Sequence, residues 1–388
     1  MNIGIELIGD LGFLLLACAG VGALAYILRQ PMILGFLVAG ILIGPYGPFG
    51  LIKNIEMLEN FSDIAIVLLL FGVGLAFPLS SLRNVGKIGS VIAIIEVLVM
   101  LGLGFAIGFM FNWSFYDSMF LAAAISVSST AVIIKVLEDR GSMETTSGLL
   151  LTGVLIIEDI IAVVLISTLH SGVITGSFEI SDMAWSIAKI AIFFVSTLAL
   201  GILLVPKMFN LVTKLERFEI TITFALGLAF GLSFLSYSLG FSAATGAFLA
   251  GVIIAGSRFS DEVSTLITPV REIFVAIFFV TIGALLNLAD IGLYLIPIVV
   301  ITLVTIFGKI IGVYLGVKIF GSGRGYALAI GLSMASLGEF SFIVLKTGQD
   351  LGVISDKLFP IIGVVVVLTT FIGVMMAKKG IQTALTYE

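Results

Sequence analysis

The chain has 388 residues, of which 60% are hydrophobic and only 11% charged, with a formal net charge of −5 and a mean hydropathy of +1.27. Soluble domains carry about a quarter charged residues, so this composition excludes a soluble globular protein and predicts an all-α polytopic membrane protein. The weak net charge gives no reason to expect a nucleic-acid partner. With one histidine and no H-E-x-x-H motif, the sequence also excludes a zinc protease of that type. We expect neither an enzyme nor a cofactor.

Apolar runs divide the chain into thirteen segments that are candidates for membrane-spanning helices. Two of them, the second and the ninth, are short. In chain order, the segments cover residues 7–28, 32–44, 61–77, 88–111, 117–137, 146–169, 183–206, 219–239, 242–256, 266–286, 291–318, 325–346 and 356–377.

Lys and Arg are concentrated on one side of this arrangement, with fourteen residues against three. Because cytoplasmic loops carry the excess of positive residues, the C-terminus is expected in the cytoplasm. An odd number of crossings then places the N-terminus outside. The larger set contains Arg29, Arg83, Lys87, Lys135, Arg140, Lys207, Lys214, Arg217, Arg258, Arg271, Lys318, Arg324, Lys378 and Lys379, and the smaller set Lys53, Lys346 and Lys357.

The two halves of the chain resemble each other. Three pairs of stretches match at nearly constant offsets of 211, 209 and 207 residues, and each match links segment n to segment n+7. An odd displacement reverses the direction through the membrane, which predicts two inverted six-helix repeats with segment seven as a linker. Such repeats are typical of transporters whose site lies at the midplane on discontinuous helices. The pairs are Gly35–Gly44 with Gly246–Ala255, Leu68–Gly74 with Ile277–Gly283, and Ser126–Thr130 with Ser333–Leu337.

Two adjacent acids, Glu158 and Asp159, lie in the middle of the sixth segment, within the apolar run Leu149–Leu169. A charge at the centre of a bilayer costs between about 2.5 and 17 kcal/mol, and acids at such positions usually serve ion or proton movement. Because neighbouring residues project about 100° apart on a helix, both can face one cavity without contacting one ligand atom equally. We therefore interpret them as the place where ions or protons pass.

The fifth and twelfth segments are predicted to be interrupted helices. Hydroxyl residues cluster at the middle of the fifth segment, where Ser129 and Thr130 either bind a cation or only pack helices together. Gly338 and Glu339 lie at the middle of the twelfth. If the two interrupted helices cross, their ends meet as like dipoles, and Glu339 would compensate the positive N-terminal ends.

Two further charged residues lie inside apolar segments. Lys309 is near the middle of the eleventh segment and is either a proton-coupling residue or a structural ion-pair partner. Glu96 is in the fourth segment, where it is either a second polar contact of the core or part of an access funnel.

Taken together, several motifs resemble the monovalent cation:proton antiporters of the NapA, GerN and Kef type over nearly the whole chain. The resemblance implies an NhaA/NapA-like fold with two crossed discontinuous helices, elevator-like movement and a homodimer. The implied division is a dimerisation domain (1–87 and 219–286), a core domain (88–170 and 291–378) and a linker helix (183–206). The motifs are Pro31–Pro45, Leu68–Leu75, Ser126–Gly141, Glu158–Asp159, Lys309 and Ser336–Val344.

The resemblance also implies roles for single residues. Asp159 matches the essential ion- and proton-binding aspartate, and Lys309 matches the lysine that pairs with the preceding acid in electrogenic members. Glu158 departs from the family, whose members have Asp, Asn or Gln there. Glu339 matches an acid near the helix crossing.

These observations predict an antiporter of the cell membrane, surrounded by lipid, that exchanges Na⁺ for protons by competition at Asp159. A Kef-like K⁺/H⁺ antiporter or potassium efflux system is the alternative. Two protons per cation would follow if Glu158 forms a salt bridge with Lys309, and one if Lys309 is structural. A cation channel is a distant alternative, since no selectivity-filter sequence is visible.

Overall fold

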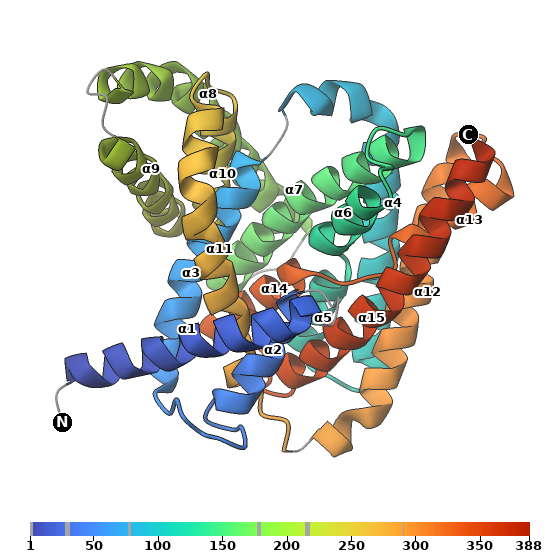
Figure 1. Ribbon diagram of the computed structural model, residues 1–388. Helices are drawn as coiled ribbons and strands as arrows, with labels where there is room; N and C mark the ends of the chain where they lie inside the picture. The colour runs from blue at the N-terminus through green and yellow to red at the C-terminus, as the bar shows by residue number, and fades with distance from the viewer. Residues whose placement is uncertain (1–2, 28–31, 77–78, 177–179, 214–217, 290) are drawn as a thin grey trace. The chain divides into compact units, whose positions relative to one another are not determined.

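A computed structural model describes residues 3–27, 32–76, 79–176, 180–213, 218–289 and 291–388, and every regular element in these ranges is a helix (Figure 1). One isolated β-bridge joins Ser128 and Leu337. The elements are α1 (Ile3–Ile27), α2 (Met32–Ile43), α3 (Ile55–Leu75), α4 (Leu79–Met110), α5 (Phe115–Ile125), α6 (Thr130–Asp139), α7 (Thr146–Thr175), α8 (Ile180–Thr213), α9 (Phe218–Ser238), α10 (Ala243–Ala255), α11 (Ser260–Leu285), η1 (Ile291–Tyr294), α12 (Leu295–Ile319), α13 (Arg324–Ser333), α14 (Glu339–Asp350), α15 (Leu358–Ala384) and η2 (Leu385–Tyr387).

The prediction of an all-helical protein with many membrane crossings is confirmed. In the described part of the chain, nine helices are long and apolar enough to span a membrane. This is fewer than the thirteen predicted segments because α2 and α10, with 12 and 13 residues, are shorter than the roughly 20 residues that a bilayer requires. The predicted fifth and twelfth segments are each divided between two helices, α5 with α6 and α13 with α14.

The chain forms two compact units, each built from two separate stretches of sequence. Unit 1 contains Met1–Leu79 and Ile174–Asp290, and unit 2 contains Ser80–Val173 and Ile291–Glu388. Helix α8, which covers the predicted linker, belongs to unit 1. The two acids of α7 and all the other predicted site residues belong to unit 2.

Glycines allow the helices of unit 1 to approach each other closely. A Cβ atom added to Gly40 of α2 would lie 2.0 Å from the carbonyl oxygen of Val280 in α11, and one added to Gly283 would lie 2.2 Å from that of Leu37. Helices α3 and α10 meet in the same way through Gly74 and Gly251, whose added Cβ atoms would lie 2.1 and 2.2 Å from carbonyl oxygens of the opposite helix. Small residues are the usual means of close helix packing in membranes.

The two contacts of unit 1 are related by the sequence repeat. Gly40 aligns with Gly251 at the offset of 211, and Gly74 aligns with Gly283 at the offset of 209. Each helix of one repeat therefore packs against the non-equivalent helix of the other, through a glycine at the matching position.

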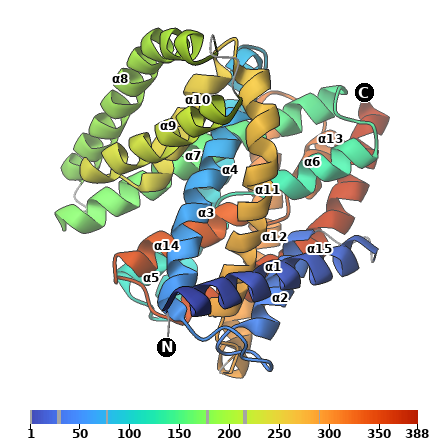
Figure 2. The same cartoon turned by 60° about the vertical axis from the view of Figure 1, so that its left-hand side comes forward.

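In unit 2, α13 packs along both α12 and α15, as both views of the chain show (Figure 2). Helix α4 approaches α12 at two glycines of α12. Added Cβ atoms would lie 2.8 Å from the Cα of Glu96 at Gly312 and 2.8 Å from the Cα of Ile92 at Gly316. The absence of side chains at these positions brings the middle of α4 next to the middle of α12, where Lys309 lies.

Two polar contacts fix the outer ends of helices that carry the site. The Glu388 side chain accepts hydrogen bonds from the backbone N–H groups of Thr146 (3.2 Å) and Ser147 (2.5 Å), which are the first residues of α7. At the start of α5, the buried Asp117 carboxylate accepts from the backbone N–H and the hydroxyl of Ser355, both at 2.7 Å. The Glu388 contact satisfies N–H groups of the first turn of α7, which have no partner within the helix, and the Asp117 contact ties the start of α5 to the loop before α15.

The glycine contacts predict the effect of adding one methyl group. Gly40→Ala places a Cβ atom against the α11 backbone, which cannot rotate away as a side chain does, so the melting temperature in detergent should fall by several degrees. Gly231→Ala in α9 is the matched control, because nothing lies within 4 Å of its added Cβ and alanine favours the helix. Equal melting temperatures for the two variants would contradict the close approach of α2 and α11.

Candidate functional site

The site is built around the place where two interrupted helices cross inside unit 2. Residues 126–129 separate α5 from α6, and residues 334–338 separate α13 from α14. The two gaps run antiparallel, with Ser128 bridged to Leu337 and the backbone N–H of Ser129 donating to the carbonyl of Ser336 at 3.0 Å. The backbone groups that each helix leaves unpaired are thus partly satisfied by the other interruption.

Hydroxyl side chains satisfy further backbone groups at the crossing. The Ser341 hydroxyl donates to the carbonyl of Ala124 at 2.6 Å, and the Ser126 hydroxyl to that of Ala123 at 2.8 Å. These bonds occupy carbonyls at the C-terminal end of α5, which a continuing helix would have used.

Ser129, which was predicted as a cation ligand, has a capping contact in the structure. Its hydroxyl oxygen accepts a hydrogen bond from the backbone N–H of Val132 at 3.3 Å, as the N-cap of α6. Ser and Thr are preferred at such positions because their oxygens pair with N–H groups that the first turn leaves free.

Asp159 lies beside the N-terminus of α6. Both oxygens of its carboxylate are within hydrogen-bonding distance of the Thr130 hydroxyl, at 3.1 and 3.2 Å. The side chain is buried, with the residue 6% exposed. Thr130 is the first residue of α6, so the carboxylate is next to the positive end of the helix dipole, where a negative charge is favoured.

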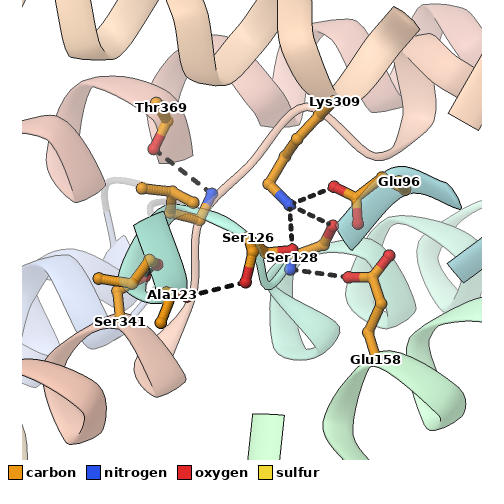
Figure 3. A network of polar contacts seen from close by, with 10 residues as sticks. Glu96, Ala123, Ser126, Ser128, Glu158, Lys309, Ser341 and Thr369 are labelled. Carbon is orange, nitrogen blue, oxygen red and sulfur yellow. Dashed lines mark hydrogen bonds and ion pairs between the residues drawn. The ribbon is translucent and has the colours of Figure 1, made fainter. Parts of the chain in front are cut away.

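Glu158 points to a different part of the crossing from its neighbour. Its Oε2 atom accepts from the backbone N–H of Ser128 at 2.8 Å, and the residue is fully buried (Figure 3). Its Oε1 atom has no hydrogen-bond partner in the described part of the chain. The two adjacent acids therefore contact the α6 end of the interruption at two places, Ser128 within it and Thr130 at the start of α6.

Lys309 is fully buried and has three partners for its three N–H groups. Its Nζ atom lies 2.7 Å from Glu96 Oε1, 3.0 Å from the Ser128 hydroxyl and 3.2 Å from the carbonyl of Ser126 (Figure 3). Glu96 is fully buried as well, and this contact is an ion pair. The ammonium group therefore joins α4, α12 and the interruption between α5 and α6.

The partner of Lys309 differs from the one considered in the sequence. The conditional pairing with Glu158 is not the ion pair that forms, because Glu96 supplies the carboxylate and Glu158 bonds to backbone. The Glu158 and Glu96 charges still interact directly, so one lysine lies near two acids. The available sequence signal was that Glu96 and Lys309 are oppositely charged residues in the middle of two apolar segments.

Glu339 is the first residue of α14, and its side chain lies outside the described part of the structure. The preceding residue, Gly338, explains how the interruptions come so close. A Cβ atom added there would lie 2.8 Å from the Cα of Ser129. A side chain at position 338 would push the two gaps apart.

The chemistry of the site suits a monovalent cation and a proton as substrates. The described residues contain no cluster of three or more His, Cys, Asp or Glu side chains that would hold a multivalent metal. Asp159 and Thr130 instead offer one carboxylate and one hydroxyl, and hard cations prefer such oxygens. A carboxylate can also accept a proton.

Comparison with known proteins identifies a family. A family model described as "Sodium/hydrogen exchanger, transmembrane" matches residues 13–378. The probable Na⁺/H⁺ antiporter GerT of Bacillus cereus is 31% identical over 90% of this chain and 92% of its own length. The Na⁺/H⁺-K⁺ antiporter GerN of the same organism is 29% identical over 96% of each chain.

More distant relatives and a solved structure extend the comparison. K⁺ efflux antiporter 4 of Arabidopsis thaliana is 28% identical over 92% of this chain and 61% of its own length. The sodium proton antiporter MjNhaP1 of Methanocaldococcus jannaschii superimposes with a TM-score of 0.75 over 99% of both chains at 20% identity, which shows a common fold.

The buried ion pair predicts an asymmetry between single and double variants. Lys309→Met leaves Glu96 charged, buried and without its cation, which in known cases costs about 3–5 kcal/mol. Glu96→Gln/Lys309→Met removes both charges and should recover most of the stability, measured as thermal unfolding in detergent.

Lys135→Met is the control for removing a lysine charge. Lys135 pairs with Asp139 at 3.0 Å, but its side chain is 67% exposed, so this variant should change the melting temperature little. If Lys309→Met is as stable as Lys135→Met, the pairing of Lys309 with Glu96 is wrong.

Proposed function

Because the chain belongs to the sodium/hydrogen exchanger family, whose members are multi-pass membrane proteins, we propose that it exchanges cytoplasmic Na⁺ for protons at Asp159. The observation that carries this proposal is the position of Asp159, a buried carboxylate beside the N-terminus of an interrupted helix and in contact with the Thr130 hydroxyl. A hydroxyl can turn its hydrogen away and offer a lone pair to a cation, whereas a backbone N–H cannot.

The mechanism is competition between two positive charges for one carboxylate. With Na⁺ bound, the Asp159 oxygens and the Thr130 oxygen face the ion, and water completes its shell. Protonation removes the negative charge and converts one oxygen into a donor, so the cation is released. Each transit of the site then carries either the cation or the proton, and exchange follows.

Glu158 is proposed to complete the cation site from the opposite side. Its Oε2 atom is fixed by the backbone N–H of Ser128, which holds the carboxylate in one orientation. Its Oε1 atom is buried without a hydrogen-bond partner in the described residues. The carboxylate interacts directly with that of Glu96, so a nearby cation would offset the repulsion between the two acids. Ser129 is the weaker candidate of the predicted ligands, because its hydroxyl oxygen already caps α6.

Alternating access is proposed to occur through movement between the two units. Unit 2 contains the whole site and would carry the ion, as the core domain of an elevator does. Unit 1 would hold the contacts of a homodimer, and the N-terminus would be outside, as the loop charges indicate. The inverted repeat is supported by two matching glycine contacts, one between α2 and α11 and one between α3 and α10.

K⁺/H⁺ exchange is the second candidate, and a specific observation favours it. Relatives include both Na⁺/H⁺ antiporters and K⁺ efflux antiporters, and GerN is described with both ions. Carboxylate and hydroxyl oxygens serve either cation. Proteoliposomes with an internal pH dye, given an outward gradient of Na⁺ or of K⁺ in turn, would assign the ion.

Replacing the central carboxylate should abolish exchange. Asp159→Asn keeps the shape but binds neither a proton nor a cation by charge, so cation-driven pH changes in proteoliposomes should disappear while the protein remains folded. Thr130→Val removes one ligand and should raise the half-saturating cation concentration about tenfold, as expected for a bond to a charged group. Asp139→Asn, on the exposed end of α6, is the charge-matched control and should transport normally. Normal rates for Asp159→Asn would refute the site.

The response to membrane potential tests the role of Lys309. Because Glu96, Ser128 and Ser126 occupy all three of its N–H groups, we expect Lys309 to remain a structural cation and exchange to be one for one. Sodium-driven proton flux should then be the same with and without valinomycin, which clamps the potential at zero when potassium is balanced across the membrane. A flux that shifts with the potential, and loses that shift in Glu96→Gln/Lys309→Met, would make Lys309 a proton-coupling residue.

A further inference from the structure

Two threonines of α12 are buried with unpaired hydroxyl groups. The hydroxyl oxygens of Thr302 and Thr305 are inaccessible and have no hydrogen-bond partner in the described part of the chain. Buried threonines in helices normally donate to the carbonyl one turn back. Thr168 does so to Val164 at 2.7 Å, and Thr347 to Ile343 at 2.9 Å. The hydroxyls of Thr302 and Thr305 are thus available to another ligand.

Helix spacing places both threonines on the face of α12 that carries Lys309. Thr305 precedes Lys309 by four residues and Gly308 by three, and Thr302 precedes Thr305 by three. Side chains at these separations are neighbours on one face. The same face meets α4, because a Cβ atom added to Gly308 would lie 2.7 Å from Met100 Sδ. A polar strip therefore leads from Lys309 toward the N-terminal end of α12.

The strip ends at another buried atom without a partner. Glu96 uses Oε1 to bind Lys309, while its Oε2 atom has no hydrogen-bond partner in the described residues. Three polar atoms on α4 and α12 are thus buried and unpaired within one region of unit 2. Buried polar groups of this kind are usually bridged by ordered water, which both donates and accepts.

We propose that a file of bound water runs from the Glu96–Lys309 pair along Thr305 and Thr302 to the N-terminal end of α12 and conducts protons. Neighbouring positions on a helix face are roughly 5–6 Å apart, which one water molecule bridges with two hydrogen bonds. A proton that enters at the outer end displaces one at the inner end, where the unpaired Oε2 atom of Glu96 accepts it while Oε1 keeps its bond to Lys309. Glu158, whose carboxylate interacts directly with that of Glu96, is the next acceptor, so Lys309 stays charged. In the orientation proposed above, the file opens to the outside.

The role in transport rests on the proposed function, but the water itself does not, so it is tested first and without transport. Microsecond X-ray footprinting generates hydroxyl radicals from water, including buried water, and Met100 lies beside Gly308 with no exposed surface. We expect Met100 to be oxidised at least several-fold faster than Met57, a buried methionine packed in an apolar cluster of unit 1. Thr302→Val/Thr305→Val should reduce oxidation of Met100 and leave Met57 unchanged. Equal, slow oxidation of both methionines would overturn the proposal.

The melting temperature and turnover of the same variants give a second test, because dry and hydrated hydroxyls predict opposite results. If the hydroxyls were dry, valine would remove an unpaired polar group and raise the melting temperature without changing transport. If they bind water, Thr302→Val/Thr305→Val should not raise the melting temperature, and turnover should fall several-fold with an unchanged half-saturating cation concentration. Thr302→Ser/Thr305→Ser keeps the hydroxyls and should restore turnover. A more stable valine variant with normal turnover would refute the file.

The two hypotheses fail in distinguishable ways. Asp159→Asn should abolish exchange and still show rapid oxidation of Met100, since Asp159 does not contribute to the strip. If the wild-type protein does not exchange cations for protons but Met100 is oxidised rapidly, the proposed function is wrong and the water file stands. If exchange is normal and Met100 is oxidised no faster than Met57, the file alone is wrong.

Discussion

Backbone groups that lose their helical partners inside a membrane must be satisfied within the protein, because hydrocarbon offers no hydrogen bonds. Helices α5 and α6 end and begin at the same place as α13 and α14, and the two interruptions pair through Ser129 and Ser336. The site extends this pairing, since Glu158 accepts from the Ser128 N–H and Lys309 donates to the Ser126 carbonyl. The charged residues therefore both depend on the interruption and help to maintain it.

Four of the ionisable side chains that the structure describes lie at the crossing, and each has a different kind of contact. Lys309 and Glu96 neutralise each other and connect α12 to α4. Glu158 is fixed to backbone, while the contact described for Asp159 is a rotatable hydroxyl at the start of α6. A carboxylate that must bind and release ions benefits from partners that rearrange at little cost, whereas buried ion pairs are expensive to break. The ion pair of Lys309 with Glu96 is therefore the fixed part of the crossing.

Glu158 contacts the interruption between α5 and α6 through its carboxylate. Its side chain is one methylene longer than that of Asp and reaches the backbone of the neighbouring interruption at 2.8 Å. Lys309 is correspondingly paired with α4 instead of with α7. The fold is shared with MjNhaP1 at 20% identity, so the scaffold is common while side-chain pairings such as these belong to this chain.

The sequence by itself determined the membrane class, the two acids of α7, Lys309 and the interruptions near Ser129 and Gly338, because each is a local signal of hydropathy, charge or composition. Only the tertiary structure decided which groups meet. Glu96 and Lys309 are 213 residues apart, and their pairing depends on the close approach of α4 to α12 at Gly312. The capping role of Ser129 likewise depends on where α6 begins. Pairings of this kind arise from packing between distant segments, which no local pattern encodes.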